Sequence, residues 1–72
     1  MERYRITTTG QAGGEQTWVL LPDRASAIMQ AEELSQREKT LHVRVYHEAG
    51  GTRELAVDLP PRAPGGAEGR AE

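Results

Sequence analysis

One amphipathic segment, residues 24–39, divides this chain of 72 residues into two halves, and each half has the pattern of two β-strands. The segment is rich in good helix formers, and Asp23 stands where a carboxylate can cap the first helical turn. Five residues share one stripe of the predicted helix: Ala27, Ile28, Ala31, Leu34 and Ser35. Because most of these side chains are small, the stripe predicts a helix that lies close against a sheet.

The two segments before the helix alternate as half-buried strands do. Residues 3–9 are rich in β-branched side chains, and residues 15–21 form a second alternating run that ends at Pro22. Between them, residues 10–14 contain three glycines. A glycine-rich break between two such runs indicates a hairpin.

The two segments after the helix have the same organisation. Residues 41–46 are the clearest strand of the chain, residues 48–51 are typical of a turn, and residues 52–59 form the last strand. Three residues of that last strand are expected to point toward the core: Leu55, Val57 and Leu59. Residues 1–59 are therefore predicted to form a single α+β domain, a two-layer ββαββ sandwich with a four-stranded sheet and one helix packed on one face.

Residues 60–72 differ in composition from the rest of the chain. They consist mainly of Pro, Gly, Ala and charged residues and lack large apolar side chains. Such a segment has too little apolar surface to offset the entropy of folding. We expect it to be a disordered tail.

Two strand orders are compatible with a helical crossover between the second and third strands. In the order 2-1-3-4 the sheet is fully antiparallel, and we expect the arginines of the first strand to lie beside His42 and Arg44, which are like charges. In the order 2-1-4-3 the same arginines lie beside Glu54 and Asp58. Opposite charges on neighbouring strands stabilise a sheet by roughly 0.2–1 kcal/mol per pair. The order 2-1-4-3 is therefore favoured.

The favoured order resembles the β-grasp layout of ubiquitin-like proteins over residues 1–59. Gly65-Gly66 follows the last strand, where ubiquitin-like carriers keep the diglycine that becomes activated. The resemblance implies a carrier processed at Gly66 as a lesser alternative function. The Trp of the second strand, the Ala-rich helix, the Val-x-Val strand and the Gly-Gly turn also resemble features of several short bacterial domains, and these features imply no activity.

Composition excludes several classes of function. The formal net charge of −2 and the pI near 5.7 argue against a surface that attracts phosphate everywhere. There is no Cys, and His42 and His47 have no partners at a metal-binding spacing. No nucleophile has a neighbouring base, so we expect no enzyme activity, no cofactor and no metal. No apolar run reaches the length of a signal peptide or a membrane span, and we expect a cytoplasmic protein without membrane contact.

The second strand is apolar on both of its faces. If Thr17, Val19 and Leu21 point toward the core, Trp18 and Leu20 point away from it; the opposite register exposes Val19 and Leu21 instead. Strands with two apolar faces are usually buried on both faces. Since one helix covers one face, only another chain or the C-terminal tail can cover the other face. A partner surface is favoured over the alternative, which is that one Trp or Leu is simply exposed, as is normal on a soluble protein.

We therefore expect a small non-catalytic protein-interaction or accessory module. It is expected to bind a protein partner or a second copy of itself through the open sheet face or a sheet edge. Six residues are the candidates for partner binding: Arg5, Trp18, Leu20, His42, Arg44 and Tyr46. The alternative is a single-stranded nucleic acid that stacks its bases on the aromatic residues of the same face, which the acidic net charge disfavours.

Overall fold

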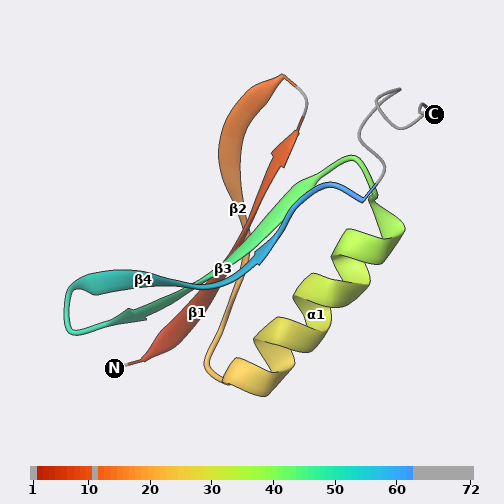
Figure 1. Cartoon of the computed structure of the whole chain (residues 1–72). Coiled ribbons are helices and arrows are strands. Elements are labelled where there is room, and N and C mark those ends of the chain that lie inside the picture. The colour runs from red at the N-terminus through yellow and green to blue at the C-terminus, as the bar shows by residue number, and fades with distance from the viewer. Residues whose placement is uncertain (1, 11, 63–72) are drawn as a thin grey trace.

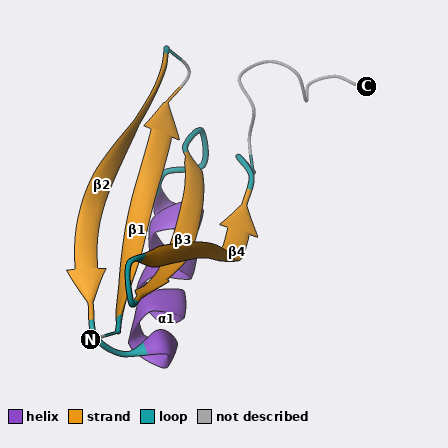
Figure 2. Cartoon of the chain, turned by 90° about the vertical axis from the view of Figure 1, so that its left-hand side faces the viewer, coloured by secondary structure: helices purple, strands orange, loops and turns teal. Residues whose placement is uncertain are grey.

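The computed structural model describes residues 2–10 and 12–62. Its elements are β1 (Arg3–Gly10), β2 (Gly13–Leu21), α1 (Arg24–Arg37), β3 (His42–Ala49) and β4 (Thr52–Leu59) (Figure 1). The four strands form one antiparallel sheet, and Figure 2 shows α1 against one side of it. The predicted two-layer ββαββ architecture is confirmed. Most of the predicted tail, including Gly65-Gly66, falls in residues 63–72, which lie outside the described residues.

The helix α1 begins where the sequence predicts. Asp23 accepts a hydrogen bond from the backbone N–H of Ser26 through Oδ2, at 2.8 Å, and so satisfies one of the free amides of the first turn. The buried residues of α1 are Ala27, Ala31, Leu34 and Ser35, which belong to the predicted stripe. Met29, on the opposite side, is 56% exposed.

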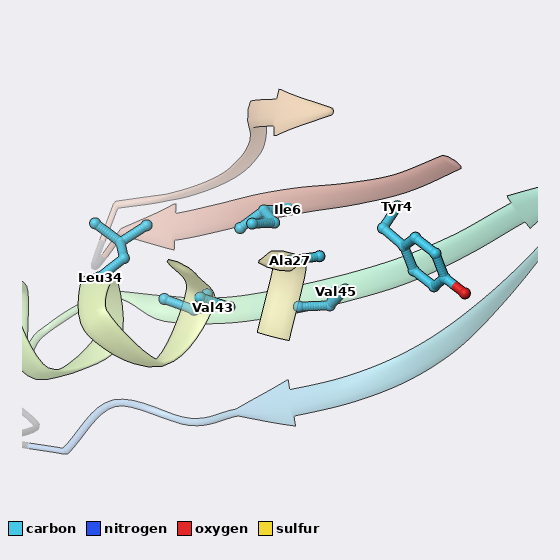
Figure 3. Packing of buried hydrophobic residues seen from close by; sticks show 7 residues of the cluster. Tyr4, Ile6, Ala27, Leu34, Val43 and Val45 are labelled. Atoms are coloured by element: carbon cyan, nitrogen blue, oxygen red, sulfur yellow. The ribbon is translucent and has the colours of Figure 1, made fainter. Parts of the chain in front are cut away.

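The core lies between α1 and the two central strands (Figure 3). Its buried apolar residues are Tyr4, Ile6, Ala27, Ala31, Leu34, Val43 and Val45. The strands β1 and β3 supply four of them, because each has a neighbouring strand on both sides. The edge strands contribute only partly buried residues at the rim: Val19, Leu21, Ala56, Val57 and Leu59.

The strand order is β2-β1-β3-β4, so the favoured order 2-1-4-3 is wrong. The strands β1 and β3 are antiparallel, and the start of β1 therefore meets the end of β3. Arg3 lies opposite Glu48, while Arg44 lies opposite Thr7. The like-charge contact that counted against this order does not arise. The likeness to the β-grasp layout is also lost, because it required β1 and β4 to be neighbours.

The strand β3 extends to Ala49, beyond its predicted end at Tyr46. His47 and Glu48 therefore lie in the strand and not in a turn. His47 is on the α1 side of the sheet, where its ring stacks on that of Tyr4 with the centroids 4.9 Å apart. Glu48 points to the opposite side.

The side of the sheet away from α1 is the open face. The register of the strands places on it Arg3, Arg5, Thr7 and Thr9 from β1, Glu15, Thr17 and Leu20 from β2, His42, Arg44, Tyr46 and Glu48 from β3, and Arg53, Leu55 and Asp58 from β4. Most of these side chains are polar or charged. All six candidate residues except Trp18 are among them.

A β-bulge in β2 accounts for the position of Trp18. Val19 lies opposite Ile6, and Thr17 lies opposite the next residue of β1. Trp18 is thus the extra residue of the bulge, and its side chain is 44% exposed. Simple alternation places Thr17 on the same side as Val19, and that prediction is wrong. Thr17 lies on the open face instead, where its hydroxyl accepts a hydrogen bond from Arg5 Nη1 at 2.9 Å.

A second bulge, in β4, corrects the prediction for Leu55. Val57 and Leu55 lie opposite consecutive residues of β3, which leaves Ala56 as the extra residue. Val57 and Leu59 pack against the core as predicted. Leu55 does not: it lies across from Tyr46 on the open face and is 52% exposed.

Candidate interaction surface on the open face

One row of open-face side chains crosses all four strands. It consists of Leu20 in β2, Arg5 in β1, Tyr46 in β3 and Leu55 in β4, each opposite the next. Three of the predicted binding residues are therefore neighbours. Leu20 is 42% exposed and Leu55 is 52% exposed, so the row has an accessible aliphatic side chain at each edge of the sheet. We call these four residues the Leu20–Leu55 row.

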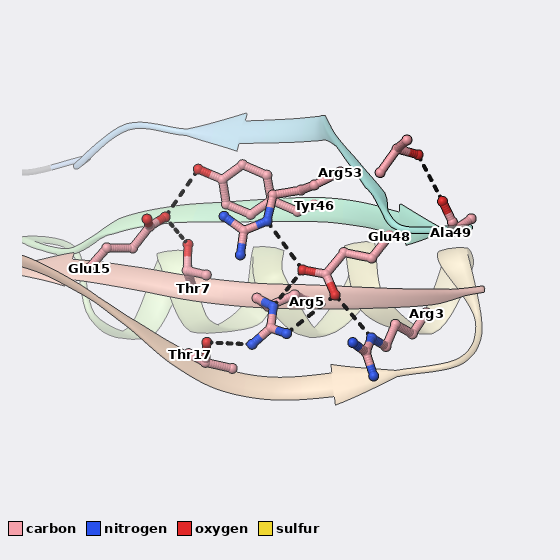
Figure 4. A network of polar contacts seen from close by, with 10 residues as sticks. Arg3, Arg5, Thr7, Glu15, Thr17, Tyr46, Glu48, Ala49 and Arg53 are labelled. Atoms are coloured by element: carbon pink, nitrogen blue, oxygen red, sulfur yellow. Dashed lines mark hydrogen bonds and ion pairs between the residues drawn. The ribbon is translucent and has the colours of Figure 1, made fainter. Parts of the chain in front are cut away.

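On one side of the row, Glu48 binds three arginines (Figure 4). Its Oε1 accepts a hydrogen bond from Arg3 Nε at 2.9 Å. Its Oε2 accepts one from Arg5 Nε at 2.7 Å and one from Arg53 Nε at 3.2 Å. The side chain of Glu48 is only 13% exposed. The hydrogen bond from Arg5 is the largest cause that lowers the pKa of Glu48 to about 2. The four residues form the basic end of the open face.

The low pKa of Glu48 predicts a dependence of stability on pH. Its value in the folded chain, about 2, is below the usual 4.5, so the unfolded chain binds more protons between these values. The stabilisation by ionised Glu48 is therefore present above pH 4.5 and is lost as the pH falls through about 2. We expect Glu48→Gln to flatten the fall in unfolding free energy over this range.

Urea unfolding at a series of pH values measures this effect. Glu32→Gln is the matched control, because Glu32 is exposed on α1 and forms no ion pair with any residue in 2–10 or 12–62. The control is expected to keep the wild-type slope. A Glu48→Gln slope equal to that of the wild type would show that Glu48 is not the group responsible.

On the other side of the row, Glu15 links three strands. Its Oε2 accepts hydrogen bonds from Thr7 Oγ1 at 2.6 Å and from the Tyr46 hydroxyl at 3.1 Å. The same oxygen lies 3.8 Å from Arg44 Nη1. The Thr7 hydroxyl is the main reason that the pKa of Glu15 lies below its usual range. Glu15 thus fixes the position of the Tyr46 hydroxyl.

Asp58 binds the two remaining candidate residues of β3. Its Oδ1 lies 2.5 Å from His42 Nε2 and 3.4 Å from Arg44 Nε. The contact with His42 is the largest cause of the lowered pKa of Asp58. Together with Glu15, these residues form the acidic end of the open face, which contains two carboxylates, one guanidinium and one imidazole.

The ring of Tyr46 is held from two directions. The guanidinium carbon of Arg53 lies 4.6 Å from the ring centroid, which is a cation–π distance. The hydroxyl is bound to Glu15. One face of this ring and its polar atom are therefore already in contact with other side chains.

Six residues of the row and its two ends are not among the predicted binding residues, namely Arg3, Glu15, Glu48, Arg53, Leu55 and Asp58. A signal for Glu48 was present, because it continues the alternation of Arg44 and Tyr46 along the strand. The signal for Leu55 was absent, since nothing in the sequence marks a bulge at Ala56.

Within the part of the chain that the structure describes, no group of three His, Asp or Glu side chains is placed to bind a metal ion. The same residues include no helix that is long and apolar enough to cross a membrane. Comparison of the chain with family models, curated proteins and solved structures found no match. The geometry of the open face is therefore the basis for a functional proposal.

Proposed function

We propose that the chain is a small non-catalytic interaction module that binds a second copy of itself through the open face. The observation that carries the proposal is the two-sided apolar character of β2. Val19 and Leu21 pack against the core, while Trp18 and Leu20 are 44% and 42% exposed. Leu20 lies on the open face, and Trp18 is exposed at the bulge in the same edge strand. Because α1 covers the other side of the sheet, a partner on the open face is needed to remove Leu20 from water.

The distribution of charge supports a second copy as that partner. Three guanidinium groups surround a single carboxylate at the basic end, whereas two carboxylates accompany one guanidinium at the acidic end when His42 is neutral. Two copies related by a two-fold axis parallel to the Leu20–Leu55 row place each basic end over the acidic end of the other. Such an arrangement is isologous and closes with two copies.

The same geometry favours a protein partner over single-stranded nucleic acid. Base stacking requires an accessible aromatic face, and Arg53 already covers one face of Tyr46. Glu15 and Asp58 lie beside Arg44 and repel phosphate groups. These contacts leave fewer accessible aromatic rings and fewer unpaired arginines for a nucleic acid than the sequence suggests.

Light scattering over a range of protein concentrations tests the proposal. The expected solution mass approaches twice 7.9 kDa at high concentration. Because opposite charges face each other across the proposed interface, high salt is expected to shift the mass back toward the monomer. A mass of 7.9 kDa that stays constant up to about 1 mM protein would contradict self-association.

A further inference from the structure

The basic end of the open face surrounds a cavity of about 370 Å³. Its lining consists of Arg3, Arg5, Glu48, Arg53 and residues 49–52, which include the β3–β4 turn. This turn extends past the end of α1 (Figure 1). Arg3 and Arg53, whose side chains are 56% and 48% exposed, line the cavity, so it is accessible from solvent.

The cavity has more positive charge than its own carboxylate can neutralise. Three guanidinium groups and one carboxylate leave a local charge of +2. Arg3 and Arg53 each bind Glu48 through Nε. Their terminal nitrogens make no hydrogen bond to any residue in 2–10 or 12–62, so both forks keep N–H donors for a ligand.

The turn at the end of the cavity leaves its backbone open. Gly50 and Gly51 have φ angles of 59° and 82°, which the two central residues of a tight hairpin turn require. The space where a Cβ would stand is empty within 4 Å at both positions. A ligand can therefore approach the main chain of the turn without displacing a side chain.

We propose that this cavity binds a phosphate dianion, either free or as the phosphate group of a small phosphomonoester. A dianion restores neutrality to a site of charge +2, and a single carboxylate ligand does not. Guanidinium forks donate paired hydrogen bonds to phosphate oxygens. The volume of the cavity lies within the range of small-ligand sites, roughly 300–1,000 Å³, which leaves room for an organic group beside the phosphate.

This site goes beyond the proposed function, since it exists in a single copy of the chain. The proposed dimer places acidic residues over the same arginines. Titrations are therefore performed on the full chain at a protein concentration well below the dissociation constant of the dimer, where the monomer predominates. A failure of phosphate binding under these conditions is then distinguishable from a failure of dimerisation, which is measured separately by light scattering.

Titration of inorganic phosphate, followed by two-dimensional amide NMR, tests the site. Saturable shift changes are expected at the amides of residues 48–53, with a dissociation constant on the order of 1 mM. Free phosphoserine is the second ligand: tighter binding than that of phosphate identifies a phosphomonoester as the occupant, and equal binding identifies the free ion. Acetate at equal ionic strength is expected to bind at least about tenfold more weakly. Equal affinity for acetate would overturn the proposal.

Two variants and one control complete the test. Arg53→Gln and Arg3→Gln are each expected to weaken phosphate binding about tenfold, because each removes one fork from the cavity. Arg3 is 56% exposed, so Arg3→Gln keeps the test valid even if Arg53→Gln disturbs the contact with Tyr46. Arg44→Gln, at the acidic end, is expected to bind phosphate as the wild type does. Shifts that do not saturate, or an equal loss in Arg44→Gln, would show general charge screening in place of a site.

Discussion

Ile6→Ala is expected to lower the free energy of unfolding by about 3 kcal/mol. Ile6 is fully buried and lies in the centre of the sheet, opposite Val19 on one side and Val45 on the other. Truncation removes buried apolar surface and leaves a cavity between β1 and α1. A domain of this size buries only about 60% of its unfolded-chain surface, and its total stability is expected to be only about 5 kcal/mol. The variant is therefore expected to lose most of its stability.

Urea unfolding followed by far-UV circular dichroism measures the loss. Met29→Ala is the matched control, because it also shortens an apolar side chain but at a position that is 56% exposed. The control is expected to change the unfolding free energy by less than about 0.5 kcal/mol. Similar losses of unfolding free energy in the two variants would mean that Ile6 is not part of the core.

The double variant Trp18→Ala/Leu20→Ala is expected to raise the dissociation constant of the dimer by about 30-fold or more. Truncation of a hot-spot residue in an interface typically costs about 2 kcal/mol or more, and Trp is prominent among such residues. Both side chains lie outside the buried core cluster. The isolated chain is therefore expected to keep its fold, and the loss is expected in association alone.

Sedimentation equilibrium measures the dissociation constant, and an unchanged amide spectrum verifies the fold. Met29→Ala serves again as the control, since Met29 is an exposed apolar side chain on α1, away from the open face. It is expected to dimerise as the wild type does. A double variant that dimerises with wild-type affinity would remove Trp18 and Leu20 from the interface.

The elements of the fold follow from local patterns, and the strand order does not. The strand segments, the Asp23 cap and the glycine turns are properties of short segments, and the structure has each of them. The strand order depends on which residues meet across strands. Charge pairs separate the two orders by only a fraction of a kcal/mol each, and their sign changes with register. The end of β3, placed too early in the sequence analysis, hid Glu48 as the partner of Arg3 and Arg5.

The composition of the open face could be predicted in part. Arg5, Leu20 and Tyr46 share a row, and Arg44 and His42 lie on the same face, as alternation along single strands indicates. A rule of period two fails wherever a residue is inserted. Neither Trp18 nor Ala56 is a glycine or a proline, so neither bulge has a local signature. Because of the bulge at Ala56, the prediction that Leu55 points toward the core is wrong.

The two bulges also limit how the chain can assemble. An edge strand without interruption presents a continuous line of free N–H and C=O groups, onto which further chains add to form open-ended fibrils. In β2 this line is broken at Trp18, and in β4 it is broken at Ala56. An incoming strand finds only short regular stretches on either edge. Growth by strand addition is therefore disfavoured at both borders of the sheet, which leaves the open face as the route for association of the exposed Leu20 and Leu55 side chains.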